Sequence, residues 1–355
     1  MEKFAVHFQG AKRDPYKQSK LVPGLIHHFG FKIQTRSKLL KTLNKVLHAE
    51  PYSKVQKARI RALFEVMTVL SDSTIWQDTW PANTKGKGMA IAPIYAAHCL
   101  SDCKRTTAFS SGLHDAIEEA MQRFPDQRPI RILYAGTGPF ATLALPSMAK
   151  FSPEDIQFDF IDIHETSTQN LSELLEKLDF EDFAQNIITK DVFDHQDADG
   201  YHIAITETMG PALANEPQIP IMRHIRKMLV ENGILLPEEI QLGLLIGNDN
   251  YQVLTPMIWK YTALEDKAET FAPLEIRYQY QPKEPCNEEV SVFAATQVKV
   301  FADNLVTFGH TSITDPIGMG TLPNIPPNSS IEVAYRAGQD LVYGTEQPIC
   351  RLISK

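Results

Sequence analysis

Four short apolar segments constrain the fold of this chain more than any other feature of its sequence. Each one ends beside a polar or glycine-rich stretch, and helical periodicity appears between or after them. These segments are predicted strands at residues 130–135, 158–163, 187–192 and 201–205, and the helical stretches span 140–150, 171–178 and 219–229. Strands that alternate with helices are typical of a parallel sheet with crossover helices. The sequence therefore predicts an α/β core with a binding site along the strand ends.

The first apolar segment runs directly into a tight turn, Gly136-Thr137-Gly138-Pro139. Glycines at this place allow the backbone to approach a ligand closely, and a helix at 140–150 would present its N-terminus to that ligand. The turn has neither a third phosphate-binding glycine nor the lysine of a phosphate-binding loop, which argues against ATP. The turn is therefore predicted to contact a nucleoside cofactor of another kind.

Acidic residues lie at the ends of the second and third segments. Asp162 stands 24 residues beyond Gly138, close to the roughly 20 residues typical of folds that bind a ribose. A carboxylate at this place can accept hydrogen bonds from the ribose hydroxyls. Asp191 is predicted to accept a hydrogen bond from an adenine amino group, and Val192 is predicted to lie in the same site.

The fourth segment releases two carboxylates into a bent loop. Glu207 follows the predicted strand closely, a Gly210-Pro211 turn comes next, and Glu216 lies beyond it. Carboxylates avoid burial unless they have partners, so this pair is expected to meet a cation. A guanidinium suits the pair best, because its fork of donors matches a carboxylate with two parallel hydrogen bonds. Two ordinary surface acids on a solvated loop are the alternative interpretation.

This loop resembles the double-glutamate loop of protein arginine methyltransferases. Eight residues separate Glu207 from Glu216, and Met209-Gly210 comes shortly after the first of them, as in that family. A second resemblance lies at 102–106, where Asp-Cys-Lys-Arg-Thr is similar to the Asp-x-x-Arg-Thr helix that precedes the cofactor strand of the family. This resemblance implies that Arg105 binds the carboxylate of S-adenosylmethionine (AdoMet).

The order of the motifs resembles class I AdoMet-dependent methyltransferases over residues 94–239. Gly-x-Gly-Pro at 136–139 and Asn-Glu at 215–216 are similar to features of the symmetric, type II arginine methyltransferases. Several positions depart from the family: Phe109 replaces a tyrosine, Ile132 an acid and Tyr134 a glycine. The Thr-His-Trp loop of the family is missing, and the nearest candidate for its histidine is His310.

The resemblance implies an α/β chain with a Rossmann-like class I methyltransferase core and two further domains. A helical N-terminal domain is expected at 1–90, the AdoMet-binding methyltransferase domain at 91–240, and a β-rich substrate domain at 241–355. Apolar and polar residues alternate at 274–280, 296–301 and 331–336, a pattern typical of antiparallel strands. We therefore expect an antiparallel, barrel-like β domain after the core.

The implied activity is AdoMet-dependent transfer of a methyl group to a guanidino or amino nitrogen. Glu207 and Glu216 are the expected catalytic residues. The residues expected to bind AdoMet are Arg105, Gly136, Thr137, Gly138, Asp162, Asp191 and Val192. The missing Thr-His-Trp loop favours a small molecule or natural-product intermediate as the substrate. A protein or peptide arginine methyltransferase is one alternative, and a non-catalytic AdoMet-core scaffold protein is another.

The cysteine content and the lengths of the apolar runs indicate the cellular location to expect for the protein. Four cysteines in 355 residues do not suggest a disulfide framework. There is no run of about 18 apolar residues that would span a membrane, and the N-terminus lacks the apolar core of a secretory signal. A cytoplasmic protein without a membrane partner is therefore expected. No metal is expected, because His98, Cys99 and Cys103 have no second pair of ligands.

The net charge of −8 hides an asymmetry along the chain. Residues 1–70 hold 14 Lys and Arg against 4 Asp and Glu, whereas the remainder holds 21 against 39. A basic segment on an acidic body predicts an acidic partner or docking between subunits, such as a homodimer through the N-terminal or β domain. A solvated lysine-rich helical face is the alternative. Nucleic acid is not an expected partner.

Overall fold

The computed structural model describes most of the chain between residues 41 and 353, with gaps. The described residues are 41–43, 45–47, 53–84, 88–214, 216–248, 251–254, 257, 259–263, 274–280, 289–322, 330–337 and 349–353. Residues 1–40, which hold much of the predicted basic segment, lie outside them, and so does Asn215. The association expected of the basic segment therefore stays a prediction.

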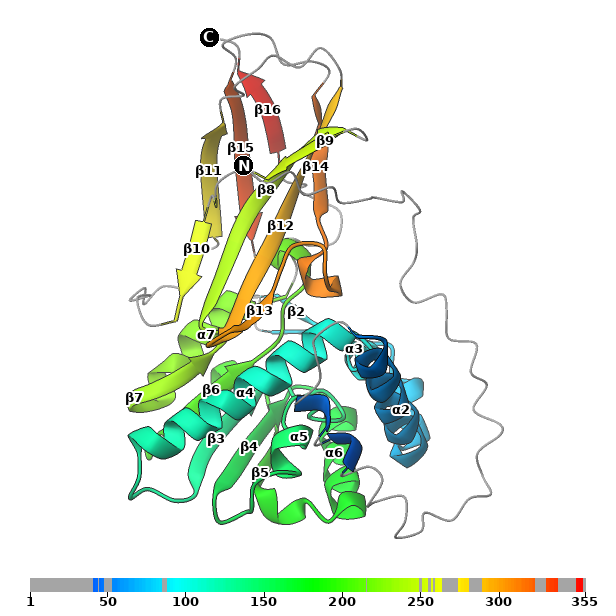
Figure 1. Ribbon diagram of the computed structural model, residues 1–355, viewed down its shortest axis with the longest axis vertical. Helices are drawn as coiled ribbons and strands as arrows, with labels where there is room; N and C mark the ends of the chain where they lie inside the picture. Colours follow the sequence, from blue (N-terminus) through cyan, green and yellow to red (C-terminus); the bar gives the residue numbers. More distant parts are fainter. Residues whose placement is uncertain are drawn as a thin grey trace.

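A five-stranded parallel sheet forms the lower half of the molecule in Figure 1. Its strands are β3 (Ile130–Ala135), β4 (Ile156–Asp162), β5 (Ala184–Thr189), β6 (Tyr201–Thr206) and β7 (Leu229–Leu236). Their order is β5-β4-β3-β6-β7, and every neighbouring pair is parallel. The chain first builds outward from β3 and then returns to the other side of β3 at β6. This topology confirms the predicted α/β class and Rossmann-like core.

Helices cover the parallel sheet, and its central strands are therefore almost entirely buried. Nearly all residues of β3, β4 and β6 are buried, as expected for strands covered on both faces. Helix α4 (Cys103–Arg123) packs against β3, β6 and β7. Helix α6 (Glu165–Leu178) packs against β4 and β5, and α7 (Gln218–Ile225) packs against β6.

The N-terminal part of the described chain adds one long helix and a small hairpin. Helix α2 (Lys54–Leu70) begins at Ser53, whose hydroxyl accepts a hydrogen bond from the backbone N–H of Gln56. The Gln56 side chain in turn donates to the Thr107 hydroxyl at 2.9 Å, which ties α2 to α4. The hairpin of β1 (Ala82–Asn83) and β2 (Met89–Ala90) and the short helix α3 (Pro93–Cys99) follow α2 and precede α4.

Antiparallel sheets form the upper half of the molecule in Figure 1 and confirm the β-rich C-terminal part. One sheet contains β8 (Glu239–Asn248), β9 (Tyr251–Leu254), β10 (Trp259–Thr262), β12 (Val290–Phe301), β13 (Asn304–Val306) and β14 (Ile317–Leu322). A second sheet contains β11 (Leu274–Tyr280), β15 (Ser330–Ala337) and β16 (Ile349–Ile353). Strands β12 and β13 pack against α4, so this helix contacts both the parallel and the antiparallel sheets.

Two predicted elements differ from the observed ones. The helix expected at 140–150 is reduced to α5 (Leu145–Met148), because the preceding residues form turns in which Ala141 has a φ of +44°. Pro146 lies in the first turn of α5, where a missing N–H is tolerated. The third strand ends at Thr189, and the residues after it form a short 3₁₀ turn (Val192–Asp194). No helix in the described part of the chain is long and apolar enough to cross a membrane.

Candidate active site

The carboxyl ends of three neighbouring strands are aligned at one edge of the parallel sheet. The register of β4, β3 and β6 places Asp162, Gly136 and Glu207 next to one another in a row. The order of the strands reverses between β3 and β6, and open α/β sheets bind ligands outside the strand ends at such a point. The row therefore stands where a ligand of this fold is expected.

A cavity of about 770 Å³, which includes the open space at its mouth, lies along this row. All nine predicted site residues line it, namely Arg105, Gly136, Thr137, Gly138, Asp162, Asp191, Val192, Glu207 and Glu216. The structure thus brings these residues together, while their roles in binding and catalysis stay predictions.

The glycine turn after β3 has a backbone that other residues would strain. Gly136 and Gly138 have φ values of +75° and +57°, a region that glycine enters without steric cost. A Cβ at Gly136 would lie 2.4 Å from Cγ2 of Thr208, and a Cβ at Gly138 would lie 3.2 Å from Cβ of Ala96. The turn therefore fits between the loop after β6 and helix α3 only because it carries glycines.

Asp162 braces this turn from the neighbouring strand. One of its carboxylate oxygens accepts a hydrogen bond from the backbone N–H of Gly138 at 2.8 Å, and the other accepts from the N–H of His164 at 2.9 Å. Burial raises the pKa of Asp162 against the effect of these hydrogen bonds. Each carboxylate oxygen can accept a second hydrogen bond, so Asp162 can hold the turn and still accept a hydrogen bond from a ligand.

Four further residues of the cavity wall carry a buried polar atom that has no hydrogen-bond partner among the described residues. They are Thr137 (Oγ1), His164 (Nε2), Ser167 (Oγ) and Asp191 (Oδ2). The other oxygen of Asp191 accepts from the backbone N–H of Phe193 at 3.1 Å. Buried polar side-chain atoms in folded proteins are nearly always paired, so their concentration in one cavity indicates a polar ligand.

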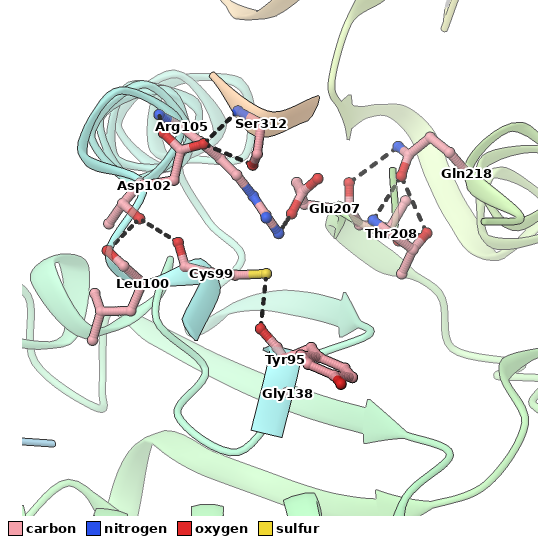
Figure 2. Close-up of polar contacts among 12 residues, drawn as sticks. Tyr95, Cys99, Leu100, Asp102, Arg105, Gly138, Glu207, Thr208, Gln218 and Ser312 are labelled. Atoms are coloured by element: carbon pink, nitrogen blue, oxygen red, sulfur yellow. Dashed lines mark hydrogen bonds and ion pairs between the residues drawn. The ribbon is translucent and has the colours of Figure 1, made fainter. Parts of the chain in front are cut away.

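The loop between the two glutamates has an unusual backbone conformation. Ala212 and Leu213 have φ values of +52° and +62°, and such residues cluster at functional sites because their strain needs support from the surrounding structure. Part of this support comes from Gln218 of α7, whose side-chain oxygen accepts from the backbone N–H of Thr208 at 2.8 Å. Figure 2 shows Gln218 holding the start of the loop beside Glu207.

Arg105 and Glu207 form an ion pair inside the cavity (Figure 2). Their side chains are 13% and 2% exposed, so the pair is largely removed from solvent. Arg105 stands in the first turn of α4, and Glu207 comes directly after the last residue of β6. Arg105, the predicted cofactor anchor, and Glu207, the first predicted catalytic glutamate, are therefore partners of each other in this structure.

The second glutamate lies close to the same guanidinium. Burial raises the pKa of Glu216 to about 7, and the positive charge of Arg105 opposes part of that rise. A Cβ at Gly210 would lie 3.1 Å from a carboxylate oxygen of Glu216, so glycine at 210 keeps room for this side chain. The cavity thus contains one strongly paired carboxylate and one that changes protonation near neutral pH.

The residues that depart from the arginine methyltransferase pattern lie outside the cavity. Phe109, Ile132 and Tyr134 are buried in the hydrophobic core. His310 is exposed, and its Nδ1 pairs with the Thr307 hydroxyl at 2.5 Å. His310 does not line the cavity, so the structure brings no support for a catalytic role of this histidine.

Some residues of the cavity wall were missed by sequence reasoning. His164 and Ser167 come shortly after Asp162, and their place just beyond a strand end was the signal that could have identified them. Cys99 and the hairpin residues Thr84 and Ala90 also line the cavity, but nothing in the local sequence marks them. These three reach the cavity only through tertiary packing.

His98 and Cys99, which were considered as metal ligands, make other contacts in the structure. The ring of His98 stacks on Phe64 with centroids 5.4 Å apart and meets Trp76 edge-on. The Cys99 thiol donates to the backbone carbonyl of Tyr95 at 3.3 Å. Among the described residues, no group of three or more His, Cys, Asp or Glu side chains has an arrangement that could hold a metal ion.

Comparisons with known proteins bear on the fold alone. No protein-family model matches this chain. A search of curated proteins found no match either. Among solved structures, the chain is similar to the Trypanosoma brucei PRMT1 enzyme–prozyme heterotetrameric complex with AdoHcy, with a TM-score of 0.46, 15% identity, and coverage of 72% of this chain and 96% of that chain. At this TM-score and identity, the similarity carries no conclusion about the activity or ligands of this chain.

Proposed function

We propose that this protein is an AdoMet-dependent methyltransferase that acts on a guanidino or amino nitrogen. The observation that carries this proposal is the composition of one cavity at the strand ends. The cavity combines a glycine turn and unpartnered polar atoms on one side with two glutamates from a single loop on the other. Such a cavity suits a polar nucleoside and a cation bound side by side.

The order of the strands suggests how AdoMet would lie. Neighbouring strands are roughly 4.8 Å apart, so the ends of β5 and β6 are separated by about 14 Å across the sheet. Asp191 and His164 follow β5 and β4, and would hold the adenine and the ribose together with Asp162. Arg105 lies beside Glu207 at the β6 end and would hold the carboxylate of the amino-acid part.

The two glutamates would prepare the substrate nitrogen. When bound, AdoMet supplies an electrophilic methyl group. A guanidinium has a pKa above about 12 and is not simply deprotonated. Glu207 and Glu216 would bind two of its nitrogens, localise the positive charge there and leave electron density on the third. Glu216 is suited to accept the released proton, because its pKa is near neutral.

The three predicted domains would then have different roles. The segment 91–240 would bind AdoMet and carry both glutamates, while 1–90 and 241–355 would shape access to the cavity. We favour a small molecule or natural-product intermediate as the substrate over a protein or peptide, because the Thr-His-Trp loop is missing. A non-catalytic scaffold protein would bind AdoMet in the same cavity without transferring its methyl group.

The first experiment measures AdoHcy binding to the purified protein by titration calorimetry. Asp162→Ala should weaken this binding by roughly 1–3 kcal/mol, the cost of an unpaired buried polar group. Glu176→Gln, an exposed substitution on α6, serves as the control and should leave it unchanged. A wild-type protein that binds neither AdoMet nor AdoHcy would refute the proposed function.

The second experiment identifies the substrate. A lysate is incubated with the protein and AdoMet carrying an isotopically labelled methyl group, and the products are analysed by mass spectrometry. Label in small guanidino or amino compounds would support the favoured substrate class, and label in protein would support the protein arginine methyltransferase. A protein that binds AdoMet and transfers no label would be the non-catalytic scaffold.

A further inference from the structure

The ion pair between Arg105 and Glu207 joins two groups that the proposed function uses for different ligands. Arg105 would bind the cofactor carboxylate, whereas Glu207 would bind the substrate cation. Both side chains are largely buried, and the other oxygen of Glu207 has no hydrogen-bond partner among the described residues. In this structure the two ligand-binding groups therefore neutralise each other.

The charges around the cavity imply that Glu207 and the cofactor carboxylate compete for Arg105. Four carboxylates line it, those of Asp162, Asp191, Glu207 and Glu216, whereas the lysines and arginines that line it are Arg105 and Lys190. Lys190 follows β5, at the far end of the row from Glu207. A cofactor carboxylate that enters beside Glu207 therefore finds one nearby cation, and that cation is already paired.

We propose that Arg105 exchanges partners on ligand binding, so that the site takes its cofactor before its guanidinium substrate. In the free protein Arg105 neutralises Glu207 and competes with any substrate cation for it. The cofactor carboxylate takes the place of Glu207 at Arg105 and leaves Glu207 and Glu216 without a side-chain cation. The substrate guanidinium then restores the balance of charge. This inference rests on the proposed function.

The exchange makes the binding of the two ligands cooperative. Because Arg105 cannot neutralise Glu207 and the cofactor carboxylate equally, each ligand strengthens the binding of the other by the same factor. The cooperativity depends on the carboxylate of the cofactor, not on its nucleoside. AdoHcy should therefore promote binding of a guanidinium, and 5′-methylthioadenosine, which has the nucleoside and thioether but no amino acid, should not.

The test uses argininamide as the guanidinium probe and calorimetry or NMR titration as the readout. For the wild-type protein we expect argininamide to bind at least tenfold more tightly with saturating AdoHcy than without it. Saturating 5′-methylthioadenosine should change the affinity by less than about threefold. This comparison requires no substitution, so it does not depend on the folding of a variant.

A substitution at Arg105 should strengthen argininamide binding to the cofactor-free protein and remove its dependence on AdoHcy. In Arg105→Gln, Glu207 has lost its internal cation, so argininamide should bind the cofactor-free variant at least tenfold more tightly than the cofactor-free wild type. AdoHcy should bind this variant more weakly and should no longer promote argininamide binding. Arg123→Gln, at the exposed end of the same helix, is the matched control and should behave like the wild type.

The outcomes separate this inference from the proposed function. Normal AdoHcy binding with argininamide affinity that is equal in its presence and absence would overturn the partner exchange and leave the proposed function standing. Failure to detect argininamide binding in any state would overturn the exchange as well. Failure of the wild type to bind AdoHcy would overturn the proposed function itself.

Discussion

Asp102 and Ser312, which are 210 residues apart in the sequence, are joined by two hydrogen bonds. One carboxylate oxygen of Asp102 accepts from both the backbone N–H and the hydroxyl of Ser312, each at 2.8 Å (Figure 2). The other oxygen caps α4 by accepting from the backbone N–H of Arg105 at 3.3 Å. A single side chain therefore connects the antiparallel part of the molecule to the helix turn that carries Arg105.

This connection predicts graded effects of substitution. Ser312→Ala removes the hydrogen bond from the hydroxyl to Asp102 and keeps the one from the backbone N–H. We therefore expect a loss of about 0.5–1.5 kcal/mol in the free energy of unfolding. Asp102→Ala also removes the helix cap and should cost about 1–3 kcal/mol, with weaker AdoHcy binding. Urea denaturation and calorimetry measure the two effects. Asp126→Ala, an exposed substitution after α4, is the control, and equal stability of the Asp102 and Asp126 variants would contradict the prediction.

Substitution of Gly136 should damage the site for two separable reasons. Gly136→Ala forces a φ of +75° on alanine and brings its Cβ 2.4 Å from Cγ2 of Thr208. Gly309 has a similar φ of +66° with nothing within 4 Å of an added Cβ, so Gly309→Ala should show only the backbone cost, about 1 kcal/mol. Gly136→Ala should cost more and weaken AdoHcy binding.

A second substitution tests the steric part of this cost. Thr208→Ser removes the methyl group that the new Cβ would meet, so it should partly restore stability to the Gly136→Ala protein. Thermal unfolding of the two single variants and the double variant measures the coupling. Strictly additive losses would show that the contact between these two positions is not the cause.

The two glutamates should be needed for methyl transfer and not for cofactor binding. Glu207→Gln and Glu216→Gln should each slow single-turnover methyl transfer to the identified substrate by about 10²-fold or more, a barrier increase of about 2.7 kcal/mol. We expect the larger loss for Glu207, which follows β6 directly and is 2% exposed. AdoHcy affinity should be kept in Glu216→Gln and should rise in Glu207→Gln, because the cofactor carboxylate then displaces no charged partner from Arg105. Full activity of Glu207→Gln would refute the proposed binding of the substrate cation by the two glutamates.

The protonation of Glu216 predicts a specific dependence on pH. Burial raises its pKa from an ordinary value of 4.5 to about 7, so the folded protein holds more protons than the unfolded chain between these two values. The contribution of Glu216 to stability therefore falls as pH rises from 4.5 to 7 and is constant above. Glu216→Gln should be more stable than the wild type at pH 8, by roughly 1–3 kcal/mol, and equally stable at pH 4. Chemical denaturation at both values checks this difference.

The same group should control cation binding. Argininamide affinity for the AdoHcy complex should rise with pH up to about 7, because Glu216 binds a cation only when it is ionised. The pH profile of Glu216→Gln should be flat over this range. A wild-type profile that is flat between pH 5 and pH 8 would show that Glu216 does not face the bound cation.

Much of the core and the membership of the site could be read from the sequence, because both depend on local patterns. The apolar run at 130–135 coincides with β3, and the helical stretch at 171–178 lies within α6. Since parallel strands end at one edge of their sheet, a polar residue after each strand is carried to that edge. The shared location of Asp162 and Glu207 therefore follows from the strand ends alone and does not depend on their long-range contacts.

Only the tertiary structure decided which partner each of these groups takes. Asp162 holds the glycine turn through Gly138, Arg105 pairs with Glu207, and Asp102 reaches Ser312. The tertiary structure also shortens the helix expected at 140–150, because its first residues form turns and are mostly buried in the core. A charged side chain has several possible partners along the chain, and burial selects one of them, because an unpaired charge away from water is too costly to keep.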